Sequence, residues 1–423
     1  MAENTAPVSS TPQEWYRNAL MTQNILFVDD MPEVLQGIRR MLHSRARQWR
    51  LHFATSGAIA LETLERTPID VIVADMRMPG MDGVQLLREV QKLYPNTARV
   101  ALSGHLGERM IMNSAAVAHQ FLAKPCTAEK LISVITRILA LRRLLHDEEL
   151  QCLATEMDNI PSLPELYQAI QDELASPLMS MKRIGDIISS DLGMSAKVLQ
   201  LVNSSFFGLF TRVSSPSQAV NLLGAETVKA LVLHVHIFSQ HNPRACQHFS
   251  LARLARHSFE VSMLARSLAL LEDAPQDVVD NAFLAGTMHD VGQLLFAVNH
   301  PRLYDELLAM VQADDMPLHQ TEEEVFGGGH DQLGAYLMGL WGMPEPVVEA
   351  IAFHHRPAEV PSDTFSPLAA LHAAECLDNA SQRSGLFGKP MELDMDYIAE
   401  CGLTERVEAW QARATELLGG GDT

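Results

Sequence analysis

The sequence predicts a doubly wound α/β domain with a parallel five-stranded sheet over residues 24–140, followed by an all-helical domain over residues 158–379. Short, continuous apolar runs alternate with segments of helical periodicity in the first part, which is typical of parallel strands buried on both faces. The second part has amphipathic helical patterns without strand-like alternation. The chain has 423 residues, of which 47% are hydrophobic and 20% charged, so it is long and apolar enough for both cores.

Five apolar runs are the predicted strands of the first domain. In chain order they are Ile25–Val28, Leu51–Ala54, Val71–Ala74, Val100–Leu102 and Gln120–Ala123. Between them, helical patterns cover Val34–Leu42, Gly57–Leu64 and Val84–Leu93. Strands that alternate with helices favour a doubly wound sheet, in which ligands bind at the carboxyl ends of the strands.

Polar residues at these strand ends form the first candidate site. Four of the ends contribute Asp29, Asp30, Asp75, Ser103 and Lys124. One such aspartate alone would be read as a helix cap. Carboxylates that converge from separate strands repel one another and need a cation, and their hard oxygen atoms suit Mg²⁺. Asp75 is then the predicted nucleophile that forms an acyl phosphate, while Lys124 and the Ser103 hydroxyl hold phosphoryl oxygens.

Residues 24–140 resemble the receiver domain of two-component response regulators. Four motifs match that family in order and spacing: Asp-Asp at 29–30, Asp-x-x-Met-Pro-Gly-x-Asp-Gly at 75–83, Ser-Gly at 103–104 and Lys-Pro at 124–125. The resemblance implies a flavodoxin-like fold and a sensor histidine kinase as the partner that phosphorylates Asp75.

The same resemblance implies a role for each residue of the site. Asp29, Asp30, Asp75 and the backbone carbonyl of Arg77 would bind Mg²⁺. Ser103 would be the switch hydroxyl, Phe121 the aromatic switch, and Lys124 would contact the phosphoryl group and precede a cis peptide bond to Pro125. The segment that ends at residues 115–119 is weakly patterned, which predicts a reduced fourth helix.

A connecting helix is predicted over residues 131–152, overlapping the last helix of the first domain. Apolar residues recur at Val134, Ile138, Leu141 and Leu145, which forms a short heptad-like seam. Two interpretations stay open: the seam forms a homodimer contact, or it packs on the first domain.

Histidines and carboxylates mark the second half of the helical domain, over residues 250–379, whereas its first half, over 158–245, lacks such a set. The candidate metal ligands are His257, His289, Asp290, His330, His354, His355, Glu375 and Asp378. Each histidine alone would be read as a core or surface residue. The adjacent His-Asp and His-His pairs favour a metal site, which bundles build from side chains of several helices. Two metal ions in such a site can activate water against a phosphodiester.

Residues 158–379 resemble the HDOD domain, an all-helical relative of the HD and HD-GYP phosphohydrolases. The motifs that carry the resemblance are Ile160–Pro164, Val202–Gly208, Ala219–Gly224, Gly286–Gly292, Trp341–Pro344 and the His354-His355 pair. The chain departs from active HD-GYP enzymes at Gln293, where they have lysine, and at Arg356, where no Gly-Tyr-Pro follows the histidine pair. Glu375 stands where they have aspartate, and Asp378 matches a second aspartate.

Two hypotheses for the output follow from these departures. In the preferred one, the HDOD domain is a protein-interaction or signalling module that reports the phosphorylation of Asp75 to a downstream signalling protein, in the context of cyclic di-GMP. The chain is then an enzyme only in its own phosphorylation chemistry. The alternative is a metal-dependent, HD-GYP-like phosphodiesterase acting on cyclic di-GMP or a related phosphodiester, with Fe, Mn or Zn as cofactor.

The charge of the chain bears on its partners. The net charge is −20: residues 141–423 have 17 Lys and Arg against 39 Asp and Glu, or −22, whereas residues 24–140 carry about +3. An acidic output region argues against direct DNA binding, because phosphate contacts need a basic surface.

Residues 1–23 are predicted to be a flexible tail, and 380–423 a helical extension without a motif. No apolar run approaches the roughly 18 residues of a membrane span. The five cysteines lack CxxC spacing, so a cytoplasmic protein is expected.

Overall fold

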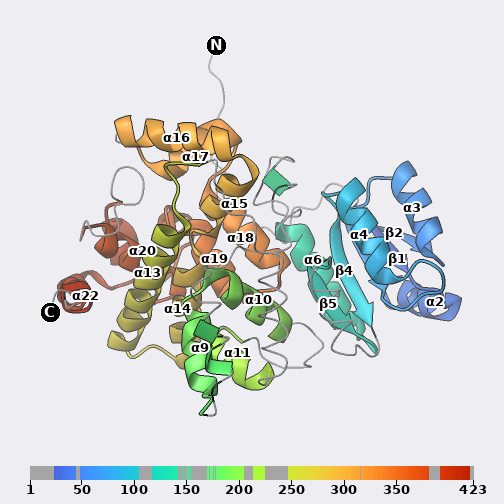
Figure 1. The fold of residues 1–423 in the computed structure, drawn as a ribbon, viewed down its shortest axis with the longest axis horizontal. Coiled ribbons are helices and arrows are strands. Elements are labelled where there is room, and N and C mark those ends of the chain that lie inside the picture. The colour runs from blue at the N-terminus through green and yellow to red at the C-terminus, as the bar shows by residue number, and fades with distance from the viewer. Residues whose placement is uncertain are drawn as a thin grey trace.

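A computed structural model describes residues 23–43, 48–103, 117–141, 145, 150, 151, 153, 169–170, 172–174, 176, 178–203, 213–223, 246–314, 316–380 and 391–419. Figure 1 shows a sheet covered by helices on one side of the molecule and a larger helical assembly on the other. The two parts predicted from the sequence are therefore both present.

Five parallel strands form one sheet in the order β2-β1-β3-β4-β5, which is the flavodoxin-like order. The strands are β1 (Gln23–Val28), β2 (Trp49–Ala54), β3 (Val71–Asp75), β4 (Ala98–Ser103) and β5 (Gln120–Ala123). All residues of β3 are buried, as a central strand covered on both faces requires. The predicted five-stranded parallel sheet is confirmed.

Helices cover the sheet: α2 (Pro32–Met41), α3 (Gly57–Arg66), α4 (Gly83–Leu93) and α6 (Ala128–Leu141). Asp82 begins α4 with a capping box, in which its carboxylate accepts from the Gln85 backbone N–H at 2.8 Å. The reduced helix predicted before β5 lies mostly outside the described residues.

Gly83 allows α4 to lie directly against the end of β3. A Cβ atom at this position would overlap the carbonyl oxygen of Asp75 and the backbone of Met76. We predict that Gly83→Ala destabilises the chain by about 1–3 kcal/mol, the range for overpacked interiors, as measured by urea denaturation followed by circular dichroism. Gly37→Ala, in α2, is the matched control because nothing lies within 4 Å of the added Cβ. That variant should be neutral or more stable by up to about 1 kcal/mol. Equal stability of the two variants would contradict this packing.

The rest of the described chain is helical. Its elements are α9 (Met181–Ser189), α10 (Leu192–Val202), α11 (Pro216–Leu223), α13 (Leu251–Leu271), α14 (Gln276–Met288), α15 (Val291–Asn299), α16 (Pro301–Asp314), α17 (Leu318–Phe326), α18 (His330–Leu340), α19 (Glu345–Phe353), η3 (Pro357–Glu359), α20 (Pro367–Ala380), α21 (Met395–Glu400), η4 (Thr404–Arg406) and α22 (Val407–Gly419). Around the histidines, α13 packs on α14 and α20, and α18 packs on α15 and α19. The all-helical prediction is confirmed for the described residues.

Helix α6 joins the two parts, since it contacts both β3 and α18. The side chain of Leu141 fills the space beside Gly339 of α18, where an added Cβ would overlap it. Arg137 Nη1 donates to the carbonyl oxygen of Met343 at 3.4 Å. The seam residues of the predicted connecting helix are buried within this one chain. The seam therefore packs partly on the helical domain, an arrangement that neither sequence interpretation included.

The C-terminal extension packs on the histidine-bearing helices, because α22 contacts both α13 and α20. Trp410 is fully buried, and its Nε1 donates to Glu272 Oε1 at 2.7 Å. Arg406 Nε donates to both oxygen atoms of the same carboxylate, at 2.9 and 3.0 Å. Residues 391–419 therefore belong to the same packed body as α13 and α20.

Several predictions concern residues that the structure does not describe. Three segments lie outside the described ranges: the tail at residues 1–22, the opening motif at 160–164 and the turn at 204–208. Among the helices that are described, none is long and apolar enough to cross a membrane.

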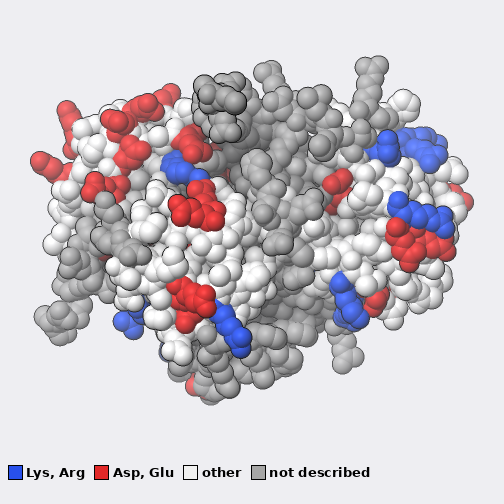
Figure 2. All heavy atoms as spheres, turned by 90° about the horizontal axis from the view of Figure 1, so that it is seen from above, with Lys and Arg blue, Asp and Glu red and all other residues white. Residues whose placement is uncertain are grey.

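Figure 2 shows acidic side chains spread over the helical side of the molecule, on the left, in keeping with the charge of the sequence.

Candidate phosphoryl-acceptor and metal sites

The carboxyl ends of three strands bring two aspartates and a lysine together. Asp29 follows β1, Asp75 ends β3, and Lys124 follows β5. Lys124 Nζ donates to Asp29 Oδ2 at 2.5 Å and lies 2.7 Å from Asp75 Oδ1. The side chain of Asp75 keeps 9% of its surface exposed, whereas that of Asp29 keeps 1%. Asp75 is thus the carboxylate of this pair that a phosphodonor can reach more easily.

Hydrogen bonds fix both carboxylates in this arrangement. The backbone N–H of Met31 donates to Asp29 Oδ1 at 2.9 Å, and that of Arg77 donates to Asp75 Oδ2 at 3.2 Å. Burial alone would lower the pKa of Lys124, but its hydrogen bonds to Asp29 and Asp75 raise that pKa above the ordinary value. Lys124 therefore remains a cation that offsets the two buried negative charges.

The other predicted residues of this site lie around the same edge of the sheet. Asp30 is half-buried directly after Asp29, and Ser103 ends β4 opposite Ala123 of β5. Phe121 is 6% exposed and pairs with Ala101 across the two strands. The Lys124–Pro125 peptide bond is cis, as predicted.

The candidate metal ligands converge from six helices and their ends. His257 lies in α13 and Glu375 in α20, while His289 and Asp290 occupy the junction of α14 and α15. His330 begins α18, and His354 and His355 follow α19. Every one of these side chains is buried except that of His355, which is half-buried. The structure thus brings together residues that lie up to 118 positions apart.

One half of the cluster is formed by His257, His289 and Glu375. Glu375 Oε2 lies 3.1 Å from His257 Nε2 and 3.2 Å from His289 Nε2. Asp290 Oδ2 closes this group at 3.6 Å from His257 Nε2 and 3.3 Å from His289 Nε2. The donor atoms of these four side chains therefore face one another.

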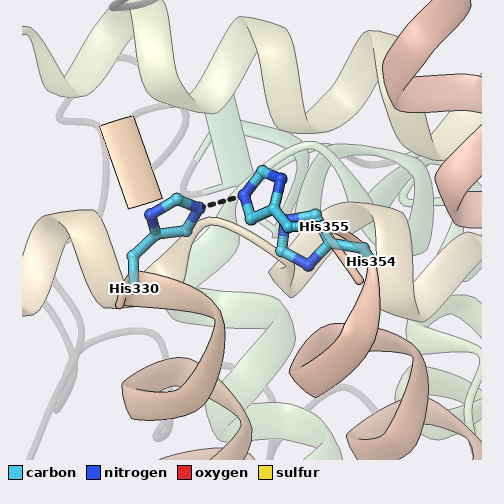
Figure 3. Close-up of side chains that lie close together, drawn as sticks. All are labelled: His330, His354 and His355. Carbon is cyan, nitrogen blue, oxygen red and sulfur yellow. Dashed lines mark hydrogen bonds between the residues drawn. The ribbon is translucent and has the colours of Figure 1, made fainter. Parts of the chain in front are cut away.

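The other half is formed by His330, His354 and His355, which Figure 3 shows side by side. The Nε2 atoms of His330 and His355 lie 2.9 Å apart, as the dashed line marks. Asp290 Oδ1 lies 3.2 Å from His330 Nε2. Asp290 therefore faces one half of the cluster with each of its carboxylate oxygens.

The donor set fits divalent metal ions. The Nε2 atom of His354 is buried and has no hydrogen-bond partner, while those of His257 and His289 face the carboxylate of Glu375 without a well-formed hydrogen bond. Ligands about 2.1 Å from one ion are separated by roughly 3 Å when they are neighbours in its coordination sphere, which matches the spacing found in both halves. Buried polar atoms without partners are costly unless a ligand satisfies them. Imidazole and carboxylate ligands together suit Zn, Fe or Mn.

The electrostatics of the cluster also favour a bound cation. Burial alone would raise the pKa of Asp290 and of Glu375, but the adjacent histidines hold both well below their ordinary values. Burial alone would lower the pKa of His289, but Asp290 and Glu375 raise it to about 9. His354 behaves differently, since burial and the charges of His289 and His330 hold its pKa well below the ordinary value. A divalent cation would replace the protons that neutralise these carboxylates.

Backbone and side-chain acceptors orient the histidine rings. His289 Nδ1 lies 2.7 Å from the carbonyl oxygen of Gly286, and His354 Nδ1 lies 2.8 Å from that of Ile351. Asp378 Oδ2 lies 2.9 Å from His257 Nδ1, on the side of the ring opposite Glu375. Asp378, counted among the candidate ligands from the sequence, is thus placed behind a ligand rather than among the converging donor atoms.

Close backbone packing also holds the halves together. A Cβ at Gly292 would overlap the backbone of His330, so α15 can approach α18 only with glycine there.

Sequence reasoning missed the residues that support the rings from behind, above all Glu322. Glu322 is fully buried, yet it belongs to the run Glu322–Glu324, which looks like an ordinary solvated face.

Comparisons with known proteins identify both parts of the chain. The family model of the response regulator receiver domain matches residues 25–136, and that of the HDOD domain matches residues 160–357. The HDOD match ends before α20, so Glu375 and Asp378 lie beyond it.

Two relatives illustrate the match. An uncharacterized protein of Treponema pallidum is 28% identical over 218 residues, which cover 51% of this chain and 41% of that protein. The cyclic di-GMP phosphodiesterase response regulator RpfG of Xanthomonas campestris pv. campestris is 24% identical over 218 residues, covering 47% of this chain and 58% of RpfG. The chain spans less than two thirds of the length of either protein.

Among solved structures, the MmoQ response regulator of Methylococcus capsulatus is 22% identical, with a TM-score of 0.48 and coverage of 60% of this chain and 98% of MmoQ. Both resemblances inferred from the sequence are confirmed by the family models, which match in the predicted order. The chain belongs to the response regulators that join an N-terminal receiver domain to an HDOD output domain.

Proposed function

We propose that phosphorylation of Asp75 controls the HDOD domain, which acts as a protein-interaction or signalling module. The observation that carries the proposal is the position of Lys124 Nζ between the carboxylates of Asp29 and Asp75. This cation lies where it can contact a phosphoryl group attached to Asp75 and offset its charge.

The residues of the receiver site divide the chemistry of phosphoryl transfer among them. An oxygen of Asp75 attacks phosphorus, so that a P–O bond forms while the P–N bond of a phosphohistidine on a sensor histidine kinase breaks. Asp29, Asp30, Asp75 and the carbonyl of Arg77 would hold Mg²⁺, which supplies positive charge to the phosphoryl oxygens when bound. Ser103 and Phe121 would respond to the phosphoryl group as the switch residues.

The contact between α6 and α18 supports a route from the receiver to the output. Helix α6 contacts β3, the strand that ends at Asp75, and it also contacts α18, the helix that begins at His330. A change at Asp75 that shifts α6 would therefore reach the histidine cluster through a single helix.

Leu141 is the residue through which we test this route. It is buried at the contact with Gly339, so Leu141→Ala leaves a cavity between α6 and α18. Leucine-to-alanine changes in cores cost about 2–5 kcal/mol, and here we expect that loss to weaken the α6–α18 contact. Beryllofluoride, a phosphoryl mimic, should then no longer alter hydrogen exchange of α18, as measured by mass spectrometry. Leu93→Ala is the control, because Leu93 of α4 is 55% exposed. A full response in Leu141→Ala would refute the proposed route.

The preference for a signalling module rests on Gln293. This residue is buried beside the cluster, at 3% exposed, and it is neutral where active HD-GYP enzymes are expected to have a lysine. A cation that would grip a phosphodiester is therefore lacking at that position. The downstream partner is proposed to be a signalling protein, and the similarity to RpfG supports cyclic di-GMP signalling as its context.

A metal-dependent phosphodiesterase is the second candidate, favoured by the two facing halves of the histidine cluster. His257, His289, Asp290 and Glu375 would hold one ion, and Asp290, His330, His354 and His355 a second. Bound Fe, Mn or Zn would supply Lewis acidity toward a phosphodiester. Incubation of the full chain with each metal and cyclic di-GMP separates the candidates: hydrolysis by the wild type that His289→Ala lacks favours the enzyme, and no hydrolysis with any metal favours the module.

The remaining proposals concern location and assembly. We propose a cytoplasmic protein that does not bind DNA directly, in keeping with its acidic output region. A homodimer through the connecting helix would require the buried contact of α6 with α18 to open. Phosphorylation would then promote dimerisation only by releasing that contact.

A further inference from the structure

A buried glutamate lies directly behind one histidine of the cluster. Glu322, in α17, is fully buried, and its Oε2 lies 2.5 Å from His330 Nδ1. The same oxygen accepts from the backbone N–H of His330 at 2.8 Å, while Oε1 accepts from the Tyr304 hydroxyl at 2.8 Å. Both carboxylate oxygens therefore have partners, and one of them fixes both the backbone and the ring of His330.

These contacts alone have an ordinary structural interpretation. A carboxylate that accepts from the first N–H of α18 stabilises the start of that helix. The second contact, between Glu322 Oε2 and His330 Nδ1, is not needed to stabilise the helix. Because a carboxylate only accepts, His330 Nδ1 carries a hydrogen, so Nε2 is the ring nitrogen left to ligate a metal ion in the cluster. There Nε2 lies 3.2 Å from Asp290 Oδ1 and 2.9 Å from His355 Nε2.

Only some rings of the cluster are backed by a carboxylate. His289 and His354 point Nδ1 at backbone carbonyl oxygens. His257 is backed by Asp378 in one half of the cluster, and His330 is backed by Glu322 in the other. Each half thus contains one imidazole whose ring and tautomer are fixed by a buried carboxylate, an arrangement that raises the basicity of a metal-ligating histidine.

We propose that Glu322 is a positioning residue that sets the affinity of the half formed by Asp290, His330, His354 and His355 for a second divalent ion. The inference rests on the proposed metal centre and adds a residue outside the predicted ligand set. Glu322 acts through His330 and does not itself touch the ion. Loss of an outer carboxylate partner of this kind lowers metal affinity by about 10–100-fold.

Titration of the full chain with Mn²⁺, followed by electron paramagnetic resonance, tests the proposal. Free and bound Mn²⁺ give separate signals, and two neighbouring bound ions couple magnetically. The wild type should bind two ions and show the coupled signal. Glu322→Gln should bind the first ion as the wild type does, but its affinity for the second ion should fall by about 10–100-fold. The coupled signal should then be lost at low Mn²⁺ concentration.

Three further variants separate positioning from folding. Glu322→Asp keeps the buried charge but withdraws it from Nδ1, so it should weaken the second ion even if Glu322→Gln does not fold. Tyr304→Phe removes only the hydrogen bond to Oε1 and should retain the second ion. Glu323→Gln is the matched neighbour, because Glu323 pairs with Arg356 at 2.7 Å and not with His330.

The outcomes distinguish this inference from the proposal on which it depends. Wild-type chain that binds no Mn²⁺ overturns the metal centre and the role of Glu322 together. Wild type with two ions and an unchanged second affinity in both Glu322 variants overturns the role of Glu322 alone. Equal loss of the second ion in Tyr304→Phe also overturns it, because a merely structural network would give that result.

Discussion

Replacing Asp75 with asparagine should abolish labelling of the chain by acetyl phosphate. An asparagine amide cannot form the acyl phosphate, because it lacks the nucleophilic carboxylate oxygen. Lys124 would keep its contact with Asp29, so the sheet and its carboxyl edge should remain folded. The chain is incubated with radiolabelled acetyl phosphate and Mg²⁺ and separated by gel electrophoresis at acidic pH. The label that it retains measures the result directly.

Asp82→Asn is the control for this substitution. Asp82 lies on the same loop but caps α4, and asparagine caps a helix about as well as aspartate. This variant should be labelled like the wild type. Labelling of Asp75→Asn at the wild-type level would place the acceptor elsewhere in the chain.

Replacing Asp290 with asparagine should remove the capacity of the HDOD domain to hold metal. Asp290 is the residue that faces both halves of the cluster, with Oδ2 toward His257 and His289 and Oδ1 toward His330. The substitution therefore weakens both proposed positions at once. We expect affinity to fall by at least about 100-fold, the upper end of the range for outer-shell partners. Metal analysis of the purified full chain by atomic emission provides the measurement.

Asp305→Asn serves as the control for Asp290→Asn. Asp305 pairs with His248 at 3.0 Å, outside the cluster. This variant should keep the metal content of the wild type. If Asp290→Asn kept it as well, the buried cluster would be an ion-pair network and not a metal centre.

The sequence predicted most of the receiver because its local signals agree with its fold. The apolar runs are continuous where β1 and β3 are buried on both faces, so their ends locate Asp29 and Asp75 without knowledge of the tertiary structure. The positions of Ser103 and Lys124 follow from the same rule, since parallel strands end at one edge of the sheet.

The histidine cluster could be predicted only as a set of residue types. Adjacent pairs such as His289-Asp290 indicated the chemistry, but periodicity does not say which ring faces which carboxylate. Asp378 illustrates the limit, because its distance along α20 from Glu375 gives no sign that it lies behind His257. Glu322 was missed for a related reason: the burial of one glutamate in an acidic run depends on how α17 meets α18.

Contacts between the parts of the chain had no sequence signal. The apolar seam around Leu141 fitted a dimer or the receiver equally well, and only the structure shows it beside Gly339 of α18. Trp410 likewise belongs to no motif in the sequence, yet its hydrogen bond to Glu272 joins α22 to the end of α13. Such long-range packing depends on shape complementarity, which single-sequence patterns do not contain.

Hydrogen exchange of α18 in the full chain, with and without beryllofluoride and Mg²⁺, tests the central claim that Asp75 controls the HDOD domain. We expect beryllofluoride to change exchange of the amides of His330–Leu340 in the wild type and to leave them unchanged in Asp75→Asn. Exchange of α18 that is identical in the wild type with and without beryllofluoride, while exchange around Asp75 does change, would contradict the account.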